Sequence, residues 1–563
     1  MRRAFTTCRT TLTAVVIAGA LTALLPPAEA DTEAVGGQTL ASLVRAGHPE
    51  AVLAAITSPA VDVNAPEPDG STALLWATYK VDHEMVRALL KAGAKANVTN
   101  NYGASPLTEA VKLGDLDMVR MLLDAHADVN SPNHDGQTAL MLAANIGSLK
   151  IAELLVGRGA TVNTVENYRG QTALMWAAAE NHPEIVDLLI SKRADVKLRA
   201  KSDDWGRQMT SEPRAQFRPT GGLTALLYAT RSGCHQCVVS LLKAGADINQ
   251  PNPDGITPLI NALDNRDYDI AMYLLDKGAN PSAWDMTGRT PLYVAVDMHS
   301  YNGRSGAGNA QFQGAEEISG PTRAENKATA VDVVNRLIGM GVDVNHELTR
   351  MRPNGNGRGR FADYMMRGGT GPLMIATLTL DDEMVQILLE HGAEVDVPNV
   401  FEITPLMAAA GMSGSSRGGV GSAIGGPGRG PQEDVQARAI KVLDLLLEHG
   451  ANINARVLNS HTRTAKLVAY VQGRDHEGQT ALFAAAEAGW DRVVKHMLER
   501  GADAGIVDAA HKTSLDYARS PPNVFPGAGS PRPQKGEAES RAATVAILEA
   551  AVPKAGGNPT ASR

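Results

Sequence analysis

The stretch that decides the fold runs from Asp135 to Asn163 and reads DGQTALMLAANIGSLKIAELLVGRGATVN. Its first part offers a threonine, Thr138, that can cap a helix of small and apolar residues. Its second part carries apolar residues at helical spacing and stops at Gly159, where a left-handed residue can end a helix. The stretch therefore predicts two short helices that share an apolar face.

The same unit recurs along most of the chain. A closing phrase such as G245-A-D-I-N ends most copies. One pair of helices cannot bury its apolar face alone, so stacked neighbours have to build a continuous core. The glycine before the first helix recurs at spacings of 33 or 34 residues within each uninterrupted run, at Gly70, Gly103, Gly136 and Gly170, then at Gly222, Gly255 and Gly288, with Gly369 and Gly478 opening later units.

The phrases T138-A-L-M, T257-P-L-I and G159-A-T-V-N resemble those of the ankyrin repeat, over nearly the whole chain after residue 30. The resemblance implies an all-α fold, an α-solenoid of about eleven to twelve repeats, each with two antiparallel helices and a short β-hairpin finger. In that family the fourth place of the T-P-L-H phrase usually holds histidine. Here apolar residues stand there instead, so the usual histidine–threonine hydrogen bonds should be absent and apolar packing should replace them. These residues are Leu75, Met141, Met175, Leu227, Ile260, Tyr293, Met374, Met407 and Phe483.

The period divides the chain into repeats and interruptions. We expect a degenerate first repeat over 31–68. Regular repeats are expected over 69–200, 221–346, 369–455 and 475–552, and a disordered tail over 553–563. Insertions fall at the fingers over 201–220, 347–368 and 456–474, and between the two helices of a repeat over 300–326, 413–433 and 520–537.

The N-terminus has the pattern of a secretory signal. Arg2 and Arg3 precede an apolar run from Leu12 to Leu25, and A-E-A closes it at Ala30. We expect cleavage after Ala30 and a mature protein in the bacterial periplasm or outside the cell. The alternative is a membrane anchor, but the run is shorter than the roughly 20 apolar residues of a spanning helix. No later segment is predicted to span a membrane.

Charge is distributed unevenly. The chain carries a formal net charge of −8, which argues against a general nucleic-acid binder. The three finger insertions are basic: residues 199–220, 347–368 and 456–474 carry net charges of +2, +3 and +4, so the remainder carries −8 − 9 = −17. Either these loops are merely solvated, or they recognise anions through arginine. The candidate partner-binding residues of the middle insertion are Arg350, Arg352, Arg358 and Arg360.

Three aromatic residues share one position in their repeats: Trp76, Trp176 and Tyr228. An apolar residue there can pack against the neighbouring helix. The alternative is exposure in the inner groove, where aromatic residues commonly anchor partners. On that hypothesis they are candidate partner-binding residues.

Cys234 and Cys237 are the cysteines left after signal removal. In an oxidising compartment they can form a disulfide, or they can be two small buried residues, or a redox dithiol at a helix start. A zinc site of four cysteines would need a second cysteine pair, which the chain lacks. The C-x-x-C-H motif for haem attachment is not matched, because Val238 and not histidine follows Cys237. The string around Ser416 matches G-x-S-x-G but lies in a glycine-rich insertion. We therefore expect no catalytic residue, metal or cofactor.

These features favour a non-catalytic scaffold that binds a protein partner through its fingers and its concave groove. Two alternatives remain open at this point. One is a binder of anionic cell-envelope polymer that uses the basic finger insertions. The other is a redox-active accessory protein that uses the cysteine pair. The sequence predicts no nucleic-acid partner and does not identify the protein partner.

Overall fold

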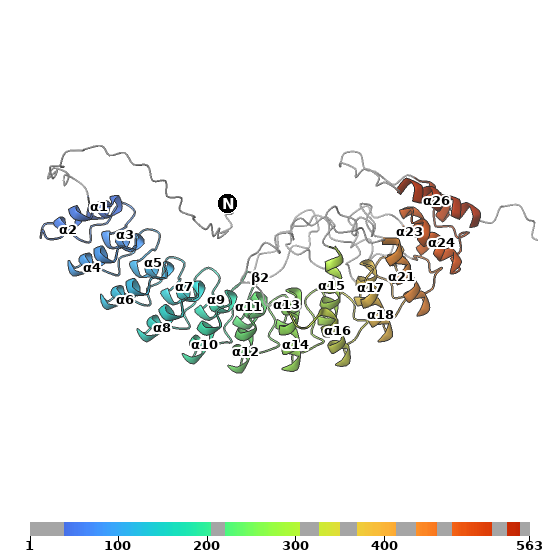
Figure 1. The fold of residues 1–563 in the computed structure, drawn as a ribbon. Helices are drawn as coiled ribbons and strands as arrows, with labels where there is room; N and C mark the ends of the chain where they lie inside the picture. Colours follow the sequence, from blue (N-terminus) through green and yellow to red (C-terminus); the bar gives the residue numbers. More distant parts are fainter. Residues whose placement is uncertain are drawn as a thin grey trace, which may run out of the picture.

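The computed structural model describes residues 39–203, 220–304, 326–349, 369–412, 435–458, 476–520 and 537–551. These residues form an α-solenoid, in which pairs of helices stack into a long curved array (Figure 1). The first helix of each pair lines the concave side, and the second helix lies on the convex side (Figure 1). The fold is therefore the one that the repeated phrases predict.

Within the described ranges, twelve helix pairs follow one another along the chain. They are α1 (Leu40–Ala46) with α2 (Pro49–Ala55), α3 (Ala73–Tyr79) with α4 (His83–Lys91), α5 (Pro106–Lys112) with α6 (Leu116–Asp124), α7 (Ala139–Ile146) with α8 (Leu149–Gly157), α9 (Ala173–Ala179) with α10 (Pro183–Ser191), α11 (Ala225–Ser232) with α12 (His235–Lys243), α13 (Pro258–Asp264) with α14 (Tyr268–Asp276), α15 (Pro291–Arg304) with α16 (Ala330–Gly339), α17 (Pro372–Leu378) with α18 (Asp382–Glu390), α19 (Pro405–Ala409) with α21 (Val435–Glu448), α23 (Ala481–Ala488) with α24 (Asp491–Glu499), and α25 (Ser514–Arg519) with α26 (Glu537–Ala551).

The ends of the helices follow from the phrases that flank them. Thr138 caps α7, since its hydroxyl accepts a hydrogen bond from the Met141 amide. Gly93 follows α4 with φ +92°, a left-handed conformation that ends the helix. Where glycine is missing, His126 and Arg193 adopt the same conformation, with φ +63° and +66°. The stop is therefore a property of the position, and glycine only makes it less strained.

Apolar packing fills the place that histidine usually holds in this phrase. Met141 is 1% exposed, Tyr293 is 0% exposed and Phe483 is 2% exposed. Burial of side chains of this size contributes about 1.5–3 kcal/mol each. The expectation that apolar contacts replace the polar network is confirmed at these positions.

An asparagine clamp, which the sequence reasoning missed, also joins neighbouring repeats. The amide nitrogen of Asn130 donates to the Gly159 carbonyl at 3.1 Å, and its oxygen accepts from the Thr161 amide at 2.7 Å. One side chain thus satisfies two backbone groups of the next repeat. The sequence signal for this clamp is the asparagine that ends the closing phrase in most units. The same pair of bonds recurs at Asn64, Asn97, Asn163, Asn345 and Asn454.

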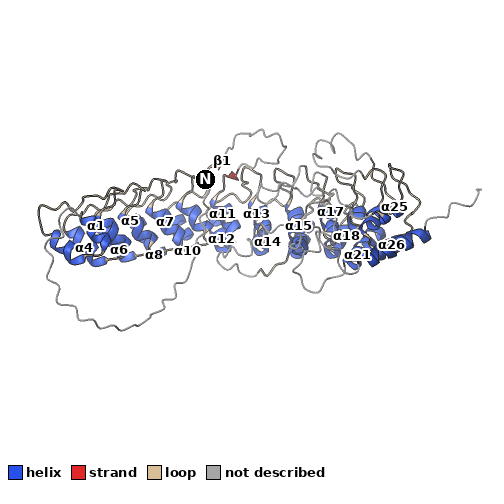
Figure 2. Cartoon of the chain, turned by 90° about the horizontal axis from the view of Figure 1, so that it is seen from above, coloured by secondary structure: helices blue, strands red, loops and turns tan. Residues whose placement is uncertain are grey.

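The expected β-hairpin fingers need correction. Among the described residues, regular strands occur only at β1 (Ser202–Asp203) and β2 (Thr220–Gly221), which pair antiparallel. In other fingers the side chain of an asparagine, aspartate or glutamate accepts from the amides that a ladder would use. At Asn100, the side-chain oxygen accepts from the amides of Tyr102 and Ala104, at 3.0 and 2.9 Å. The fingers are therefore tight side-chain-bonded turns, seen along one edge of the array in Figure 2.

Candidate interaction surfaces

The first candidate surface starts at Trp76, on the concave side of α3. Trp76 is half-buried, and its indole Nε1 donates to the Glu67 carboxylate at 2.7 Å. The Arg45 guanidinium lies 5.9 Å from the ring centroid and binds Glu67 at 3.1 Å. Tyr79 meets Trp76 edge-on at 5.9 Å and is 60% exposed. This cluster holds two aromatic rings in place before any partner arrives, which is typical of binding anchors.

An exposed apolar row continues from this cluster. Tyr79, Leu113 and Ile146 stand at the C-terminal ends of α3, α5 and α7, with exposures of 60%, 45% and 40%. These first helices contact one another in sequence, so the three residues stand on neighbouring repeats of the array. We call these three residues the concave apolar row. The sequence reasoning missed them, although each stands just beyond the buried positions of its helix.

Trp176 extends the concave surface on α9. It is half-buried, like Trp76. Its indole Nε1 is buried, and among the described residues no acceptor reaches it. A buried donor without a partner is unfavourable, so the Trp176 ring lacks the hydrogen bond that fixes Trp76.

Tyr228 is corrected from a partner-binding residue to a core residue. It is 4% exposed, and its hydroxyl accepts from the Gln171 amide nitrogen at 2.7 Å. The Arg231 guanidinium lies 4.9 Å from the ring centroid. Burial raises the pKa of the Tyr228 hydroxyl. Its repeat position is that of Trp76, but its neighbours cover it.

The candidate residues Arg350, Arg352, Arg358 and Arg360 lie outside the described residues. The cations at the ends of the other basic insertions are described, and they bind backbone carbonyls. Arg199 donates to the Pro251 carbonyl at 2.8 Å, and Lys201 donates to the Asn167 carbonyl at 2.6 Å. Arg456 donates to the Gly478 and Val507 carbonyls. Part of the basic charge thus holds neighbouring fingers together.

A buried ionic cluster lies at α13 and α15. Arg289 is 6% exposed and contacts Asp285 at 2.7 Å and Asp264 at 2.8 Å. Burial alone would raise the pKa of Asp285, but the guanidinium and the Thr287 hydrogen bonds hold it below its usual range. The two carboxylates outweigh burial at Arg289 and raise its pKa. The cluster joins the end of α13 to the turn that precedes α15, which indicates a structural role.

Cys234 and Cys237 form a disulfide at the start of α12. Cys234 is the N-cap residue, and its sulfur accepts from the Cys237 amide at 3.2 Å. The two residues are 1% and 0% exposed. Thiol–disulfide exchange needs access to a sulfur atom, so this burial does not favour a redox function.

Chemistry-bearing groups are sparse in the described part of the chain. There, no group of three or more His, Cys, Asp or Glu side chains could hold a metal ion. No helix in the same ranges is long and apolar enough to cross a membrane. Ser416 and the signal segment 1–30 lie outside the described residues.

Comparison with known families agrees with this architecture. A model described as ankyrin repeats (3 copies) matches residues 40–133, 125–200 and 226–303, and a model of the single ankyrin repeat matches 477–509. A comparison with curated proteins found no match. Ankyrin-repeat proteins generally act as scaffolds for protein–protein interaction and are not enzymes. With the helix pairs, left-handed stops and turn-like fingers of the intervening repeats, these matches show that the chain belongs to the ankyrin-repeat family.

Proposed function

We propose that this chain is a non-catalytic scaffold that binds a protein partner on its concave apolar row, after export to the periplasm or the cell exterior. The single observation that carries the proposal is the run of exposed side chains at Tyr79, Leu113 and Ile146 beside the fixed Trp76 ring. Contiguous exposed apolar surface on a soluble protein is typical of an interaction site. Fold alone does not name the partner.

The geometry of the row fits a macromolecular partner. Packed helices lie about 8–10 Å apart, so three successive first helices present a row about 20 Å long. A row of this length suits a helix or strand of another protein. The basic insertions offer the alternative, an anionic polymer, but the arginines of the middle insertion lie outside the described residues. The concave row is therefore the better-supported site.

Replacement of Tyr79, Leu113 and Ile146 by Ser should weaken partner binding. We expect a loss of at least tenfold in affinity, about 1.4 kcal/mol, because the apolar contacts disappear. A photo-crosslinking amino acid placed at Leu113 in the native cell should trap a discrete protein, and the Tyr79→Ser and Ile146→Ser changes should remove that product. The melting temperature should barely change, since all three side chains are exposed.

The same crosslinker at Lys91, an exposed residue on the convex side, is the control for random encounter. Equal products from Leu113 and Lys91, or none from Leu113, would contradict the proposed concave site.

Export gives a separate prediction. Protein isolated from its own source should begin at Asp31, because Ala28 to Ala30 match a cleavage site. In the same material, Cys234 and Cys237 should resist alkylation until a denaturant and a reductant are both added. N-terminal sequencing and intact-mass measurement check both points. Intact Met1 in cytoplasmic protein, with Cys8, Cys234 and Cys237 all free, would refute export.

A further inference from the structure

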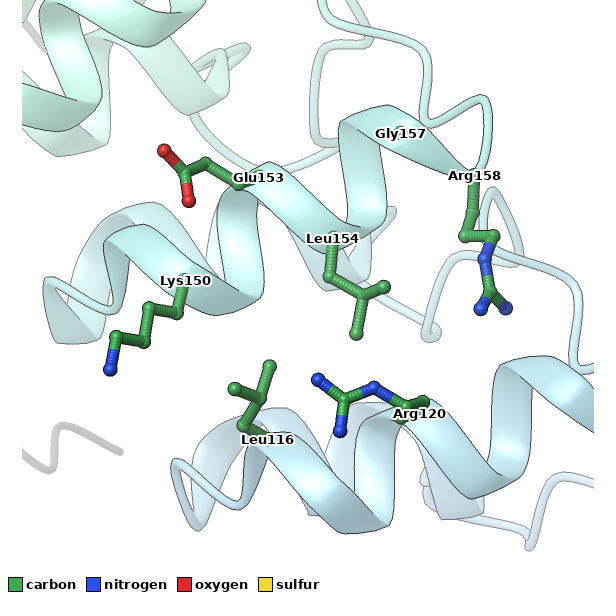
Figure 3. Close-up of a pocket in the computed structure, with 7 residues that line it drawn as sticks. All are labelled: Leu116, Arg120, Lys150, Glu153, Leu154, Gly157 and Arg158. Atoms are coloured by element: carbon green, nitrogen blue, oxygen red, sulfur yellow. The ribbon is translucent and has the colours of Figure 1, made fainter.

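A pocket of about 450 Å³ lies on the convex side, between the second helices α6 and α8 (Figure 3). It is separate from the concave row, since second helices line the opposite side of the array (Figure 1). Leu116 and Leu154 form its apolar part, and the Arg120 guanidinium lies beside them (Figure 3). Arg158 reaches toward the same gap from the end of α8, whereas Glu153 points away from α6 (Figure 3).

Gly157, the last residue of α8, lines the pocket. A β-carbon added at Gly157 would meet nothing within 4 Å, so the space beside it is open. Most other second helices carry a side chain at this last position, namely Lys91, Asp124, Ser191, Lys243, Asp276, Glu390 and Glu499. The glycine therefore leaves room for a foreign side chain.

The pocket lining is positively charged, whereas the chain as a whole is negatively charged. Its lining holds Arg120, Lys150 and Arg158 against Glu153, which is 3 − 1 = +2 in a chain of net charge −8. Lys150 stands in the first turn of α8, where the helix dipole disfavours a cation. At the same position α4, α6, α10 and α14 carry acids, which are Glu84, Asp117, Glu184 and Asp269. A bound anion would remove this unfavourable interaction.

The present partners of the two arginines are weak competitors. Arg120 binds Asp117 at 2.9 Å and Arg158 binds Asp124 at 2.8 Å. The two aspartate side chains are 77% and 60% exposed. Ion pairs this open to water contribute little, so an incoming carboxylate can displace them. Among the described residues, Lys150 has no ion-pair partner at all.

From these observations we propose that the α6–α8 pocket binds a second protein segment, one in which acidic side chains alternate with bulky apolar ones. The apolar side chain enters the space beside Gly157, against Leu116 and Leu154. The neighbouring carboxylates bind Arg120, Arg158 and Lys150. Arginine suits this role because its donors match a carboxylate in pairs.

A protein segment fits better than a small molecule. Small-molecule sites usually bury 70–90% of their ligand, and this pocket is open to solvent along one side. A longer segment can cover the opening and reach all three cations, which lie at both ends of α8 and on α6. The chain can thus hold one partner on its concave side and another on its convex side.

The test uses the full chain and a fluorescein-labelled peptide, ELDFE, with the uncharged peptide QLNFQ and the apolar-deleted peptide ESDSE as comparisons. Fluorescence anisotropy should show saturable binding of ELDFE, weakening as salt rises, and at least tenfold weaker binding of the other two. Gly157→Trp should fill the pocket and weaken ELDFE binding at least tenfold. The double variant Arg120→Gln, Lys150→Gln should also weaken ELDFE binding at least tenfold. This second variant keeps the test valid if Gly157→Trp does not fold.

Gly339→Trp is the matched control. Gly339 ends the second helix α16, and a β-carbon there would also meet nothing within 4 Å, but α16 itself holds a single basic residue, Arg336, which pairs with Asp276. This variant should bind ELDFE within twofold of the parent, as should the triple Ser variant of the concave row. The proposal is wrong if ELDFE fails to bind at about 1 mM, a very weak affinity, or if Gly339→Trp and Gly157→Trp weaken it equally. It is also wrong if QLNFQ binds as tightly, or if only phosphatidylglycerol vesicles bind and ELDFE does not displace them.

Discussion

An Arg289→Ala variant is expected to lose about 3–5 kcal/mol of stability in the repeats of α13 and α15. Removal of the guanidinium leaves Asp285, which is 3% exposed, without its charged partner in a site that water does not reach. The Asp264 contact at 2.8 Å disappears as well. Long repeat arrays do not unfold in a single step, so a global melting temperature would not resolve a loss of stability that is confined to two repeats. Amide hydrogen exchange in α13 and α15 measures it directly.

The effect should depend on pH in a defined direction. The pKa of Asp285 lies below its ordinary value in the folded protein, so its ion pair stabilises the fold above the unfolded pKa of about 3.9. That contribution is lost as pH falls through the folded pKa. In the variant, the Thr287 hydrogen bonds still oppose the effect of burial but the guanidinium no longer does, so the Asp285 carboxyl takes up a proton more easily. The difference between the parent and the variant should therefore shrink as the pH is lowered toward 4.

Arg336→Ala is the control for loss of an arginine. Its pair with Asp276 has side chains that are 44% and 61% exposed, and such a pair contributes about 0–1 kcal/mol. Equal exchange rates in the Arg289 and Arg336 variants would show that burial does not strengthen the ionic cluster of Arg289, Asp285 and Asp264.

Gly103→Ala should destabilise the chain more than Gly93→Ala by at least about 1 kcal/mol. Both glycines are left-handed, with φ +76° and +92°, so each substitution carries the same backbone strain of about 1–2 kcal/mol. At Gly103 an added β-carbon would also lie 2.6 Å from the His134 backbone nitrogen of the next finger. At Gly93 it would meet nothing within 4 Å. Overpacking of this kind costs about 1–3 kcal/mol more.

Amide hydrogen exchange in α3 and α5 compares the two variants, and proteolysis at the fingers reports local opening. Identical exchange rates would mean that neighbouring fingers can separate without cost. The close approach at Gly103 would then contribute nothing to the stacking of the repeats.

The sequence alone determined the repeat, the helix ends and the buried face. Thr138 at a helix start and Gly93 at a helix stop act through their own backbone, within a few residues, so their roles can be read locally. The apolar residue in place of histidine also predicts its own burial, as Met141 shows at 1% exposure. The family resemblance rests on the same local phrases.

Only the tertiary structure decided what each repeat presents to a partner. Trp76 and Tyr228 share one repeat position, yet Trp76 is half-buried and Tyr228 is 4% exposed, because Gln171 and Arg231 cover the tyrosine. The clamp of Asn130 on the next repeat and the space beside Gly157 likewise depend on residues about thirty positions away or on another helix. Periodicity fixes which positions face a neighbour, but exposure depends on the size and charge of that neighbour's side chains, which differ from repeat to repeat.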